Sequence, residues 1–203
     1  MRKSCFVVSV LALALCPAAS RADIVQNGSF EFFGGSGNSN IGMGIAPWVI
    51  GGGGIDICEP SAPNYWQAAD GLVSLSLNWS SPGSVSQTLT TTAGQAYEVR
   101  FWMAAEIYGG PALRTMDVAW NGSVVGSPSF LYTGQGPNNM GWTEFAYVIQ
   151  GTGLDTLSFV STTSANYGPA LDNVSVNPVP EPAALAMFSL LGVSLLRRRR
   201  NGA

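Results

Sequence analysis

Histidine is absent from this 203-residue sequence. Because histidine is the commonest general base near neutral pH and a frequent zinc ligand, its absence excludes Ser-His-Asp and Cys-His catalysis and His-ligated zinc. The acid–base groups that remain are carboxylates, and 12 Asp and Glu residues always allow some glycosidase-like pair. We therefore expect that the protein is not an enzyme, with carboxylate-based glycan hydrolysis as the alternative.

Cysteine is also scarce. Two of the three cysteines, Cys5 and Cys16, lie in a predicted signal peptide, which leaves Cys58 alone in the rest of the chain. A single thiol cannot form an internal disulfide or a cysteine-based metal site. Since no histidine is present to activate it, we expect Cys58 to be a buried, unreactive side chain.

Basic residues are few and lie mostly near the two ends of the chain. Between residues 23 and 180 only Arg100 and Arg114 remain, against eleven Asp and Glu residues, which gives this stretch a formal charge of −9. A surface of this sign repels phosphate backbones. We therefore expect no nucleic-acid partner.

The N-terminus has the three parts of a secretory signal peptide. Arg2 and Lys3 form a basic start, and residues 6–15 form a short apolar stretch. Ser20 and Ala22 supply the small side chains at positions −3 and −1 for cleavage before Asp23. The alternatives are a retained anchor helix, for which the apolar stretch is too short, and a lipoprotein. The lipoprotein is disfavoured because the residue before its cysteine is a leucine. The sequence predicts export, with residues 1–22 removed.

Residues 23–177 have the pattern of one β-rich domain. Hydrophobic content of 46% and six tryptophans are sufficient for a core, and 25 glycines suit a chain with many turns. The Gly51 to Gly54 run is expected to be a flexible loop, and Asn121-Gly122 is a strong hairpin turn. Strand-like segments, with no sustained helical periodicity between them, occur at 24–25, 71–77, 85–89, 97–103, 116–120, 124–125, 145–149, 157–160 and 171–176. This pattern predicts an all-β, two-sheet jelly-roll sandwich.

The strand at 97–103 shows the alternation most clearly. Tyr97, Val99, Phe101 and Met103 fall on one face, and Glu98, Arg100 and Trp102 fall on the other. Such alternation is typical of a β-strand, whose successive side chains point to opposite faces of the sheet.

The last residues, 178–203, combine three features in a fixed order. Val179-Pro180-Glu181-Pro182 (179–182) precedes a charge-free stretch at 183–196, and Arg197, Arg198, Arg199 and Arg200 (197–200) follow. Fourteen helical residues span only about 21 Å, short of the roughly 30 Å hydrocarbon core, but arginine side chains at the end extend the effective span. The arginines also stop translocation and keep that end cytoplasmic. We expect a C-terminal transmembrane helix.

This arrangement resembles the PEP-CTERM sorting domain. The resemblance implies recognition of Pro180, Glu181 and Pro182 by an exosortase, a membrane transpeptidase of Gram-negative bacteria that make exopolysaccharide. It also implies that the tail is cut near the motif. The alternative is a permanent membrane anchor.

The domain itself has a second resemblance. Asn27-Gly28-Ser29-Phe30-Glu31, Trp48, Gly94 to Tyr97, Gly141-Trp142 and Gly168 to Val176 are similar to segments of the choice-of-anchor C family. That resemblance implies a galactose-binding-like jelly-roll related to carbohydrate-binding modules.

Such modules often hold a structural calcium where the first and last strands meet. By this resemblance Glu31 and Asp172 would donate carboxylate oxygens, and a backbone carbonyl near Gly28 would assist, as suits a hard cation. The alternative is that both carboxylates cap turns or accept hydrogen bonds from backbone amides.

The same fold also suggests sugar binding. Sugar sites need an aromatic surface and a few directional polar groups. Tyr65 and Trp66, in a loop-forming segment, and Trp79, at a strand end, are the candidate ligand contacts. Trp48 and Trp142 match positions that are structural in such domains and are expected in the core.

Together these features predict an exported surface or extracellular-matrix protein linked to exopolysaccharide and biofilm. Its partners would be the exosortase, a polysaccharide and, transiently, the inner membrane. One structural Ca²⁺ is the only expected cofactor. The alternative to a carbohydrate-binding domain is a purely structural or adhesive protein without a defined ligand.

Overall fold

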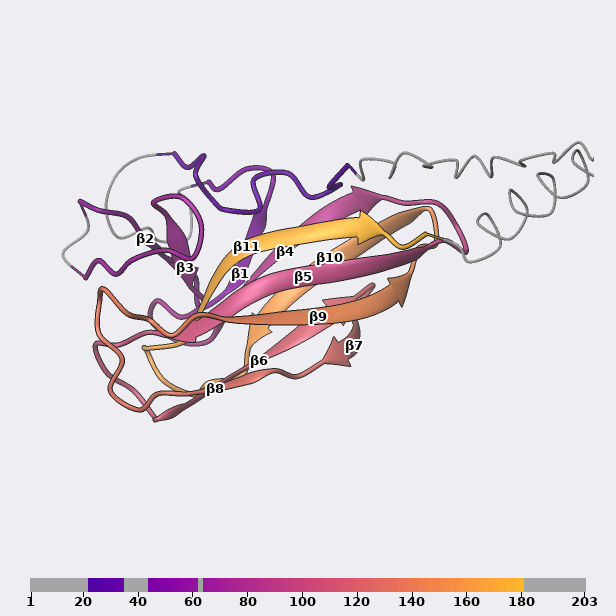
Figure 1. Ribbon diagram of the computed structural model, residues 1–203. Coiled ribbons are helices and arrows are strands. Elements are labelled where there is room, and N and C mark those ends of the chain that lie inside the picture. The colour runs from indigo at the N-terminus through magenta and orange to yellow at the C-terminus, as the bar shows by residue number, and fades with distance from the viewer. Residues whose placement is uncertain (1–21, 35–43, 62–63, 181–203) are drawn as a thin grey trace, which may run out of the picture.

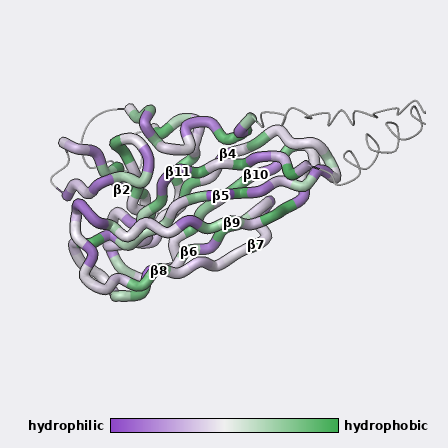
Figure 2. The backbone as a smooth tube through the Cα atoms, viewed as in Figure 1, coloured by the Kyte–Doolittle hydropathy of each residue, from purple (hydrophilic) through white to green (hydrophobic). Residues whose placement is uncertain are grey.

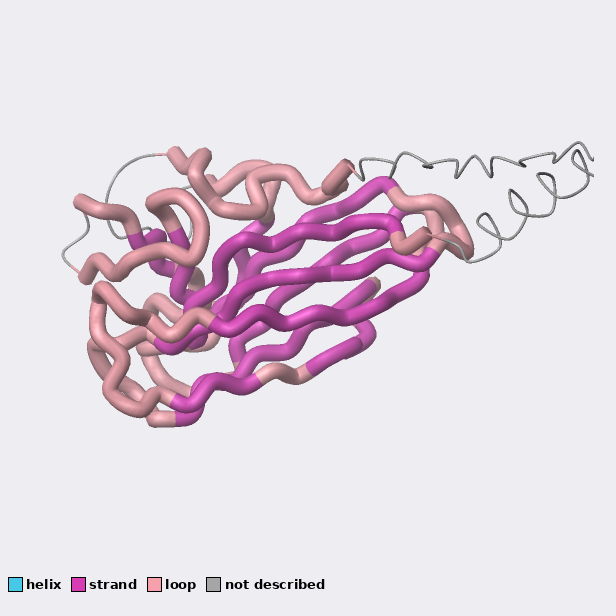
Figure 3. Tube along the Cα trace, viewed as in Figure 1, coloured by secondary structure: helices cyan, strands magenta, loops and turns pink. Residues whose placement is uncertain are grey.

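The computed structural model describes residues 22–34, 44–61 and 64–180. In these residues the chain forms strands and loops, without a helix (Figure 3). Residues 1–21 of the predicted signal peptide, the stretch at 183–196 and the arginine cluster lie outside the described residues, as do Glu181 and Pro182. Within the described part of the chain, no helix is long and apolar enough to cross a membrane.

The described strands form two antiparallel sheets packed face to face (Figure 1). One sheet has the order β1 (Val49–Gly52), β4 (Gly83–Thr90), β10 (Leu154–Ser161), β6 (Leu113–Trp120) and β7 (Ser123–Gly126), with β8 (Ser129–Leu131) also paired to β6. The other has the order β2 (Asp56–Cys58), β3 (Ser74–Ser76), β11 (Pro169–Pro178), β5 (Ala96–Ala105) and β9 (Thr143–Gln150). We call the second sheet the β5 sheet. The predicted all-β, two-sheet sandwich is confirmed.

The core lies between the sheets because the long strands alternate in polarity. Along β5, Tyr97, Val99, Phe101 and Met103 are buried, whereas the residues between them are half-buried on the outer face. The Phe101 ring meets that of Phe159 on β10 edge to face, with 4.9 Å between the ring centroids. Apolar and polar segments accordingly alternate along the strands in Figure 2. Burial of such side chains stabilises the fold by about 25 cal/mol per Å² of apolar area.

Eight of the nine predicted strands correspond to β3 to β7 and β9 to β11, with boundaries that differ by a few residues. The predicted strand at 24–25 is wrong, because this segment has only isolated hydrogen bonds to β11 and no strand pairing. The Asn121-Gly122 turn joins β6 to β7, and both residues have positive φ angles, of 51° and 78°. This conformation is the one that favours an Asn-Gly pair in tight hairpins. Three short strands, β1, β2 and β8, were not predicted.

The glycine run is a correction to the sequence analysis, because Gly51 and Gly52 belong to β1 and are not a flexible loop. They pair with Ser84 and Gly83 on β4. Gly52 has a φ of 62°, and a Cβ on this residue would lie 2.7 Å from the Pro82 carbonyl oxygen. Glycine is therefore required here by close approach of two backbones.

The loops that carry the candidate site gather at one end of the sandwich, on the left in Figure 1. Near the opposite end of β11, the start of the domain is fixed to the last strand. Ile24 N–H donates to the Val176 carbonyl (3.1 Å), and Asp23 Oδ1 accepts from the N–H groups of Val25 and Val176. The first and last segments of the domain therefore lie side by side, as the resemblance implied.

Candidate functional site

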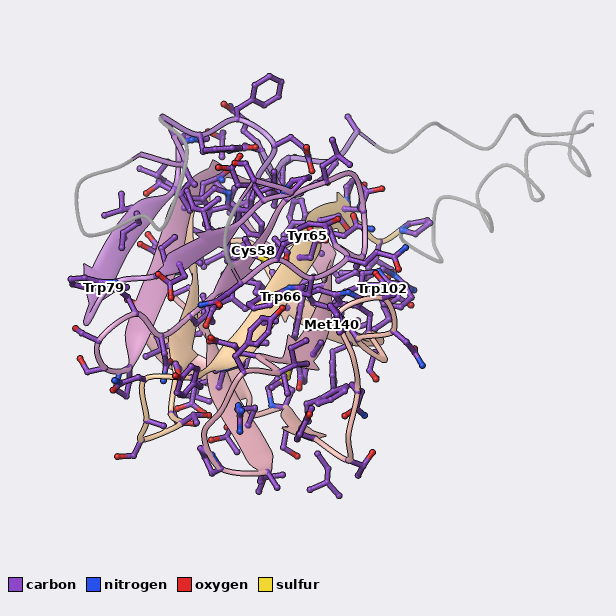
Figure 4. All side chains as sticks on the ribbon, turned by 90° about the vertical axis from the view of Figure 1, so that its left-hand side faces the viewer. Cys58, Tyr65, Trp66, Trp79, Trp102 and Met140 are labelled. Atoms are coloured by element: carbon purple, nitrogen blue, oxygen red, sulfur yellow. The ribbon has the colours of Figure 1, made fainter. Side chains whose placement is uncertain are left out.

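An open cleft of about 430 Å³ lies at the loop end of the β5 sheet, on its outer face. It is lined by Gln67, Ala68, Ala69, Trp102, Asn138, Asn139, Met140, Gly141 and Trp142. Figure 4 looks onto this end of the molecule and shows Trp102 beside Met140. The lining combines aromatic surface with side-chain amides and contains no ionisable side chain.

Trp102 forms the floor of the cleft and comes from β5. The two-residue period of the strand places its indole on the outer face, because its neighbours Phe101 and Met103 point into the core. Trp102 pairs with Glu144 on β9 and with Asp172 on β11. Directly opposite residues of antiparallel strands share a face, so a carboxylate-bearing residue stands on each side of the tryptophan.

Two loops form the walls of the cleft and are hydrogen-bonded to each other. The first wall is residues 67–69, and the second is the loop at residues 136–142. Gln67 N–H donates to the Pro137 carbonyl at 2.7 Å, and the indole N–H of Trp142 donates to the Gln67 carbonyl at 2.9 Å. Within the second loop, Gly136 and Asn139 exchange backbone hydrogen bonds of 2.9 and 3.2 Å. These bonds fix the separation of the walls before any ligand arrives, which lowers the entropy cost of binding.

Asp172 anchors the first wall from below. Its Oδ2 accepts hydrogen bonds from the N–H groups of Ala69 (2.7 Å) and Asp70 (2.9 Å), and its Oδ1 accepts from Asn173 N–H (2.6 Å). The side chain is fully buried, and this burial raises the pKa of its carboxyl to about 7, although the three hydrogen bonds act in the opposite direction. Asp172 therefore connects the last strand to the wall of the cleft.

Glu31 likewise holds a backbone segment in place, at residues 72–73. Its Oε1 accepts hydrogen bonds from the N–H groups of Leu72 (2.8 Å) and Val73 (2.9 Å). The carbonyl of Gly28, the third expected calcium ligand, accepts the N–H of Val174 at 3.0 Å. Each of the three residues thus holds backbone amides, which is the alternative that the sequence allowed.

The hydrogen bonds of Glu31 and Asp172 favour the amide alternative over a calcium site. Calcium takes six to eight oxygen ligands, whereas three carboxylate oxygens of Glu31 and Asp172 are already bound to five backbone N–H groups. Within 22–34, 44–61 and 64–180, no group of three or more His, Cys, Asp or Glu side chains is placed to hold a metal ion. We derive no function from a metal here.

We predict that removing divalent cations leaves the stability of the domain unchanged. Because Glu31 and Asp172 are satisfied by amides, the melting temperature should be the same in excess EDTA and in millimolar Ca²⁺. Differential scanning calorimetry measures this directly. A melting temperature that drops by several degrees in EDTA and recovers when Ca²⁺ is restored would show that the two carboxylates bind metal.

The three aromatic residues predicted as ligand contacts lie in different environments. Trp66 is only 2% exposed, and its indole N–H donates to Ser74 Oγ at 2.9 Å. Its ring has no face open to a sugar, and it does not line the cleft, so the structure does not place Trp66 where it could contact a ligand there. Tyr65 is half-buried, and Trp79 is exposed but lies on the other side of this end of the molecule from Trp102 (Figure 4). The structure does not bring these three residues together at one site.

The sequence analysis assigned Trp142 to the core and did not select Trp102 as a ligand contact. Trp48 is buried as expected, with its indole N–H bound to the Asn27 carbonyl at 2.9 Å. Trp142, in contrast, is half-buried and lines the cleft. A signal for Trp102 was present, because the alternation of residues 97–103 placed it with Glu98 and Arg100 on the more polar face of the strand. Neither Asn138 nor Asn139 has a sequence signal that separates it from other loop residues.

A cluster of buried and half-buried polar side chains lies beside Trp66, on the outer face of β2 and β3. Ser76 Oγ donates to Glu106 Oε2 at 2.7 Å, and Cys58 is a buried free thiol, as expected. Burial raises the pKa of the Glu106 carboxyl to about 7, that of Asp56 to about 6 and that of Cys58 to about 12. The thiol therefore stays protonated at neutral pH and is a poor nucleophile.

Because of these raised pKa values, we expect the free energy of unfolding to decrease as the pH rises. A carboxyl whose pKa is higher in the folded than in the unfolded state favours folding while it is protonated. For Glu106 this contribution is complete below its ordinary value of 4.5 and is lost as the pH rises through about 7. The expected loss is roughly 3 kcal/mol at most, since one pKa unit corresponds to about 1.4 kcal/mol.

Chemical denaturation across this pH range measures the effect. Glu106→Gln, which keeps an oxygen to accept from Ser76 Oγ, should have a flatter profile than the unmodified protein. A free energy of unfolding that rises between pH 4.5 and 7 would contradict the assignment.

Comparisons with known sequences match the chain to a family and to a much longer relative. The profile of a family described as "Protein of unknown function (DUF642)" matches residues 23–177. Over 188 residues the sequence is 28% identical to halomucin of Haloquadratum walsbyi; the match covers 87% of this chain but only 2% of halomucin. The chain thus spans a small fraction of that relative's length.

Two solved structures illustrate the likeness in fold. The structure of TmCBM61 in complex with β-1,4-galactotriose matches with a TM-score of 0.54 and 17% identity, over 78% of this chain and 99% of that one. The CBM22-1 xylan-binding domain of Paenibacillus barcinonensis Xyn10C matches with a TM-score of 0.49 and 17% identity, over 79% of this chain and 97% of that domain. The first match shows that the sandwich has the galactose-binding-like fold of carbohydrate-binding modules.

Proposed function

The chain belongs to the DUF642 family, and we propose that its sandwich is a non-catalytic carbohydrate-binding domain whose ligand occupies the cleft over Trp102. The observation that carries the proposal is the composition of this cleft. Sugar rings have apolar C–H faces and hydroxyl edges, and they are bound by aromatic surfaces together with directional polar groups. The indoles of Trp102 and Trp142 offer the aromatic surface, and the amides of Gln67, Asn138 and Asn139 offer the hydrogen bonds.

The shape of the cleft supports a chain-like ligand. It is open, so a polysaccharide can enter from the side without a free chain end, and its walls are fixed by the hydrogen bonds between Gln67, Pro137 and Trp142. TmCBM61, which has a similar fold, was solved with β-1,4-galactotriose. We therefore take β-1,4-galactan as the first ligand to test.

Affinity electrophoresis and calorimetry test the proposal. The protein should be retarded in gels that contain a soluble neutral polysaccharide, beginning with β-1,4-galactan and continuing with xylan and β-glucans. Bovine serum albumin serves as the control for retardation by gel viscosity. If no glycan in such a panel retards the protein or releases heat, the proposed function is wrong and a structural or adhesive role without a defined ligand is favoured.

Glycan hydrolysis is the alternative function, and we consider Asp56 and Glu106 for it because both carboxyl groups have raised pKa values and interact with each other. Hydrolysis needs two carboxyl groups that reach opposite sides of a glycosidic bond. Glu106 is only 4% exposed and bonded to Ser76, and the cleft itself has no carboxyl group in its lining. We therefore propose binding without catalysis. Release of reducing ends from a bound polysaccharide, lost in Glu106→Gln, would reverse this conclusion.

We further propose that the protein is exported and sorted through its C-terminal tail. The support is in the sequence alone: the motif at 179–182, the apolar stretch at 183–196 and the arginines at 197–200. In this proposal an exosortase recognises Pro180, Glu181 and Pro182, the tail anchors the protein in the inner membrane until cleavage, and the domain reaches the surface or the exopolysaccharide matrix.

Mass spectrometry of the secreted protein tests the sorting proposal. The mature N-terminus is expected at Asp23, and the mature C-terminus is expected near the motif. Deletion of residues 179–203 should change where the protein accumulates. A secreted form that retains residues beyond Leu190 would contradict cleavage of the tail.

A further inference from the structure

The charges around the cleft carry a further inference about its ligand. Resting on the proposed function, we propose that the cleft binds uncharged glycans and discriminates against polyanionic ones, such as uronic-acid and sulfated polysaccharides. Three observations support this selectivity: the neutral lining, the carboxylates beside the floor, and the absence, within the described residues, of a basic side chain without an acidic or carbonyl partner.

The lining gives neutral recognition. Gln67, Asn138 and Asn139 are amides, which donate to and accept from hydroxyl groups equally well. None of the lining residues carries a positive charge that could pair with a carboxylate or sulfate. Anionic sugars are usually held by arginine, whose two parallel N–H groups match a planar carboxylate.

The carboxylates make the field at the floor negative. Glu144 and Asp172 stand directly opposite Trp102 on the two neighbouring strands, and such pairs have Cβ atoms about 4.5–5.5 Å apart. Asp70, which follows the wall residue Ala69, is exposed and accepts a hydrogen bond from Ser29 Oγ. An anionic ligand in the cleft would therefore lie close to several like charges.

Both arginines of the domain are already engaged. Arg100 Nε lies 2.7 Å from Glu98 Oε2, and its Nη1 lies 3.1 Å from Glu144 Oε2, so one positive charge is shared by two negative ones. Arg114 is fully buried, and its guanidinium donates to the carbonyls of Glu106, Gly109 and Gly168. The sequence has no lysine between residues 23 and 180. Apart from Arg100, whose charge is shared in this way, the described part of the chain has no exposed basic side chain to compensate an anionic glycan.

Matched pairs of polysaccharides test the selectivity. Hydroxyethylcellulose and carboxymethylcellulose share a backbone and differ in charge, as do carboxyl-reduced polygalacturonate and polygalacturonate. Binding is measured by calorimetry and affinity electrophoresis, in low salt and at a pH above the raised pKa of Asp172, about 7. β-1,4-Galactan is the neutral reference. Each anionic member should bind at least roughly tenfold more weakly than its neutral partner, because like charges brought together at an interface are strongly unfavourable.

Ionic strength and charge-reversal variants test whether repulsion near the cleft causes the weaker binding of anionic polysaccharides. The difference should shrink at high ionic strength, because the Debye length falls from about 10 Å at 0.1 M to about 3 Å at 1 M. Glu144→Lys, beside the floor, should improve polygalacturonate binding at least about fivefold, since it replaces repulsion by attraction. Glu98→Lys is the matched control, because it makes the same change in net charge at the other partner of Arg100. It lies four residues from Trp102 along β5, or about 13 Å away.

The outcomes separate this inference from the proposed function. Weaker anionic binding, restored by Glu144→Lys but not by Glu98→Lys, supports it. Equal or tighter binding of the anionic polysaccharides overturns the selectivity while leaving carbohydrate binding intact. An equal gain in both variants also overturns it, because the effect would then reflect net charge and not the cleft. If no neutral or anionic glycan binds, the proposed function fails and the selectivity fails with it.

Discussion

Replacing Trp102 by alanine is expected to weaken binding of a neutral glycan by about 30-fold, which corresponds to about 2 kcal/mol and is typical of an aromatic residue at the centre of an interface. The floor of the cleft would lose the ring against which a sugar packs. The amides of Asn138 and Asn139 would remain, and Trp142 would be the one aromatic side chain left in the lining. Calorimetry with β-1,4-galactan, or with whichever neutral glycan binds best, measures the loss.

Trp79→Ala is the matched control for this substitution. Trp79 is also a partly exposed tryptophan at the loop end, but it lies away from the cleft. It should bind the glycan as the unmodified protein does. Because Trp102 is half-buried on the outer face, its removal should leave the fold intact, and the melting temperature of the variant checks this. If Trp79→Ala loses binding and Trp102→Ala retains it, the site has been assigned to the wrong surface.

Replacing Asp172 by alanine is expected to cost about 3 kcal/mol of stability, because three backbone N–H groups would lose their acceptor and an unsatisfied buried donor costs about 1–3 kcal/mol. The donors belong to Ala69, Asp70 and Asn173. For a domain of this size about 3 kcal/mol lowers the melting temperature by roughly 6–12 °C. Calorimetry of the variant and of the unmodified protein gives the difference.

The same substitution should also weaken glycan binding, since Ala69 lines the cleft and would be less firmly held. Asp117→Ala is the control, because the Asp117 carboxylate accepts a hydrogen bond from the Ser127 hydroxyl at an exposed position. We expect Asp117→Ala to change stability by less than about 0.5 kcal/mol, as is usual for a surface substitution. If Asp172→Ala is as stable as Asp117→Ala, then Asp172 does not anchor the wall.

The fold could be predicted further than the site, and the reason is physical. Strand periodicity depends on local sequence, so the alternation at residues 97–103 predicted the strand β5 and placed Trp102 on the face opposite Phe101. The Asn121-Gly122 turn was equally local. β1 could not be recognised, because Gly51 and Gly52 have no side-chain pattern and form a strand only through contact with β4.

The positions of the tryptophans depend on tertiary contacts that the sequence does not encode locally. Trp66 is in a segment of loop-forming residues, which suggested exposure. It is buried because Ser74 accepts a hydrogen bond from its indole and Tyr108 lies 6.3 Å away, measured between ring centroids. Trp142 was assigned to the core, yet its bond to the Gln67 carbonyl holds it at the edge of the cleft. A loop aromatic can pack inward or outward with the same neighbours in sequence, so only the fold separates the two.

The anchoring carboxylates show a similar limit. The sequence marked Glu31 and Asp172 as residues with a structural role and left two chemistries open, calcium and backbone amides. The amide donors lie far from both carboxylates in the sequence. Leu72 and Val73 are about 40 residues from Glu31, and Ala69 and Asp70 are about 100 residues from Asp172. Contacts over such separations follow from the arrangement of strands, not from any local motif.

The indole N–H signals of the six tryptophans in a ¹H–¹⁵N NMR spectrum test the central claim most directly. Each can be assigned by single substitution and followed while a neutral glycan is added. If the ligand occupies the cleft, the signals of Trp102 and Trp142 move with a common saturation curve, and those of buried Trp48, Trp66 and Trp120 stay in place. If the signal of Trp66 or Trp79 moves and that of Trp102 does not, the ligand binds elsewhere on the domain and the assignment of the cleft is contradicted.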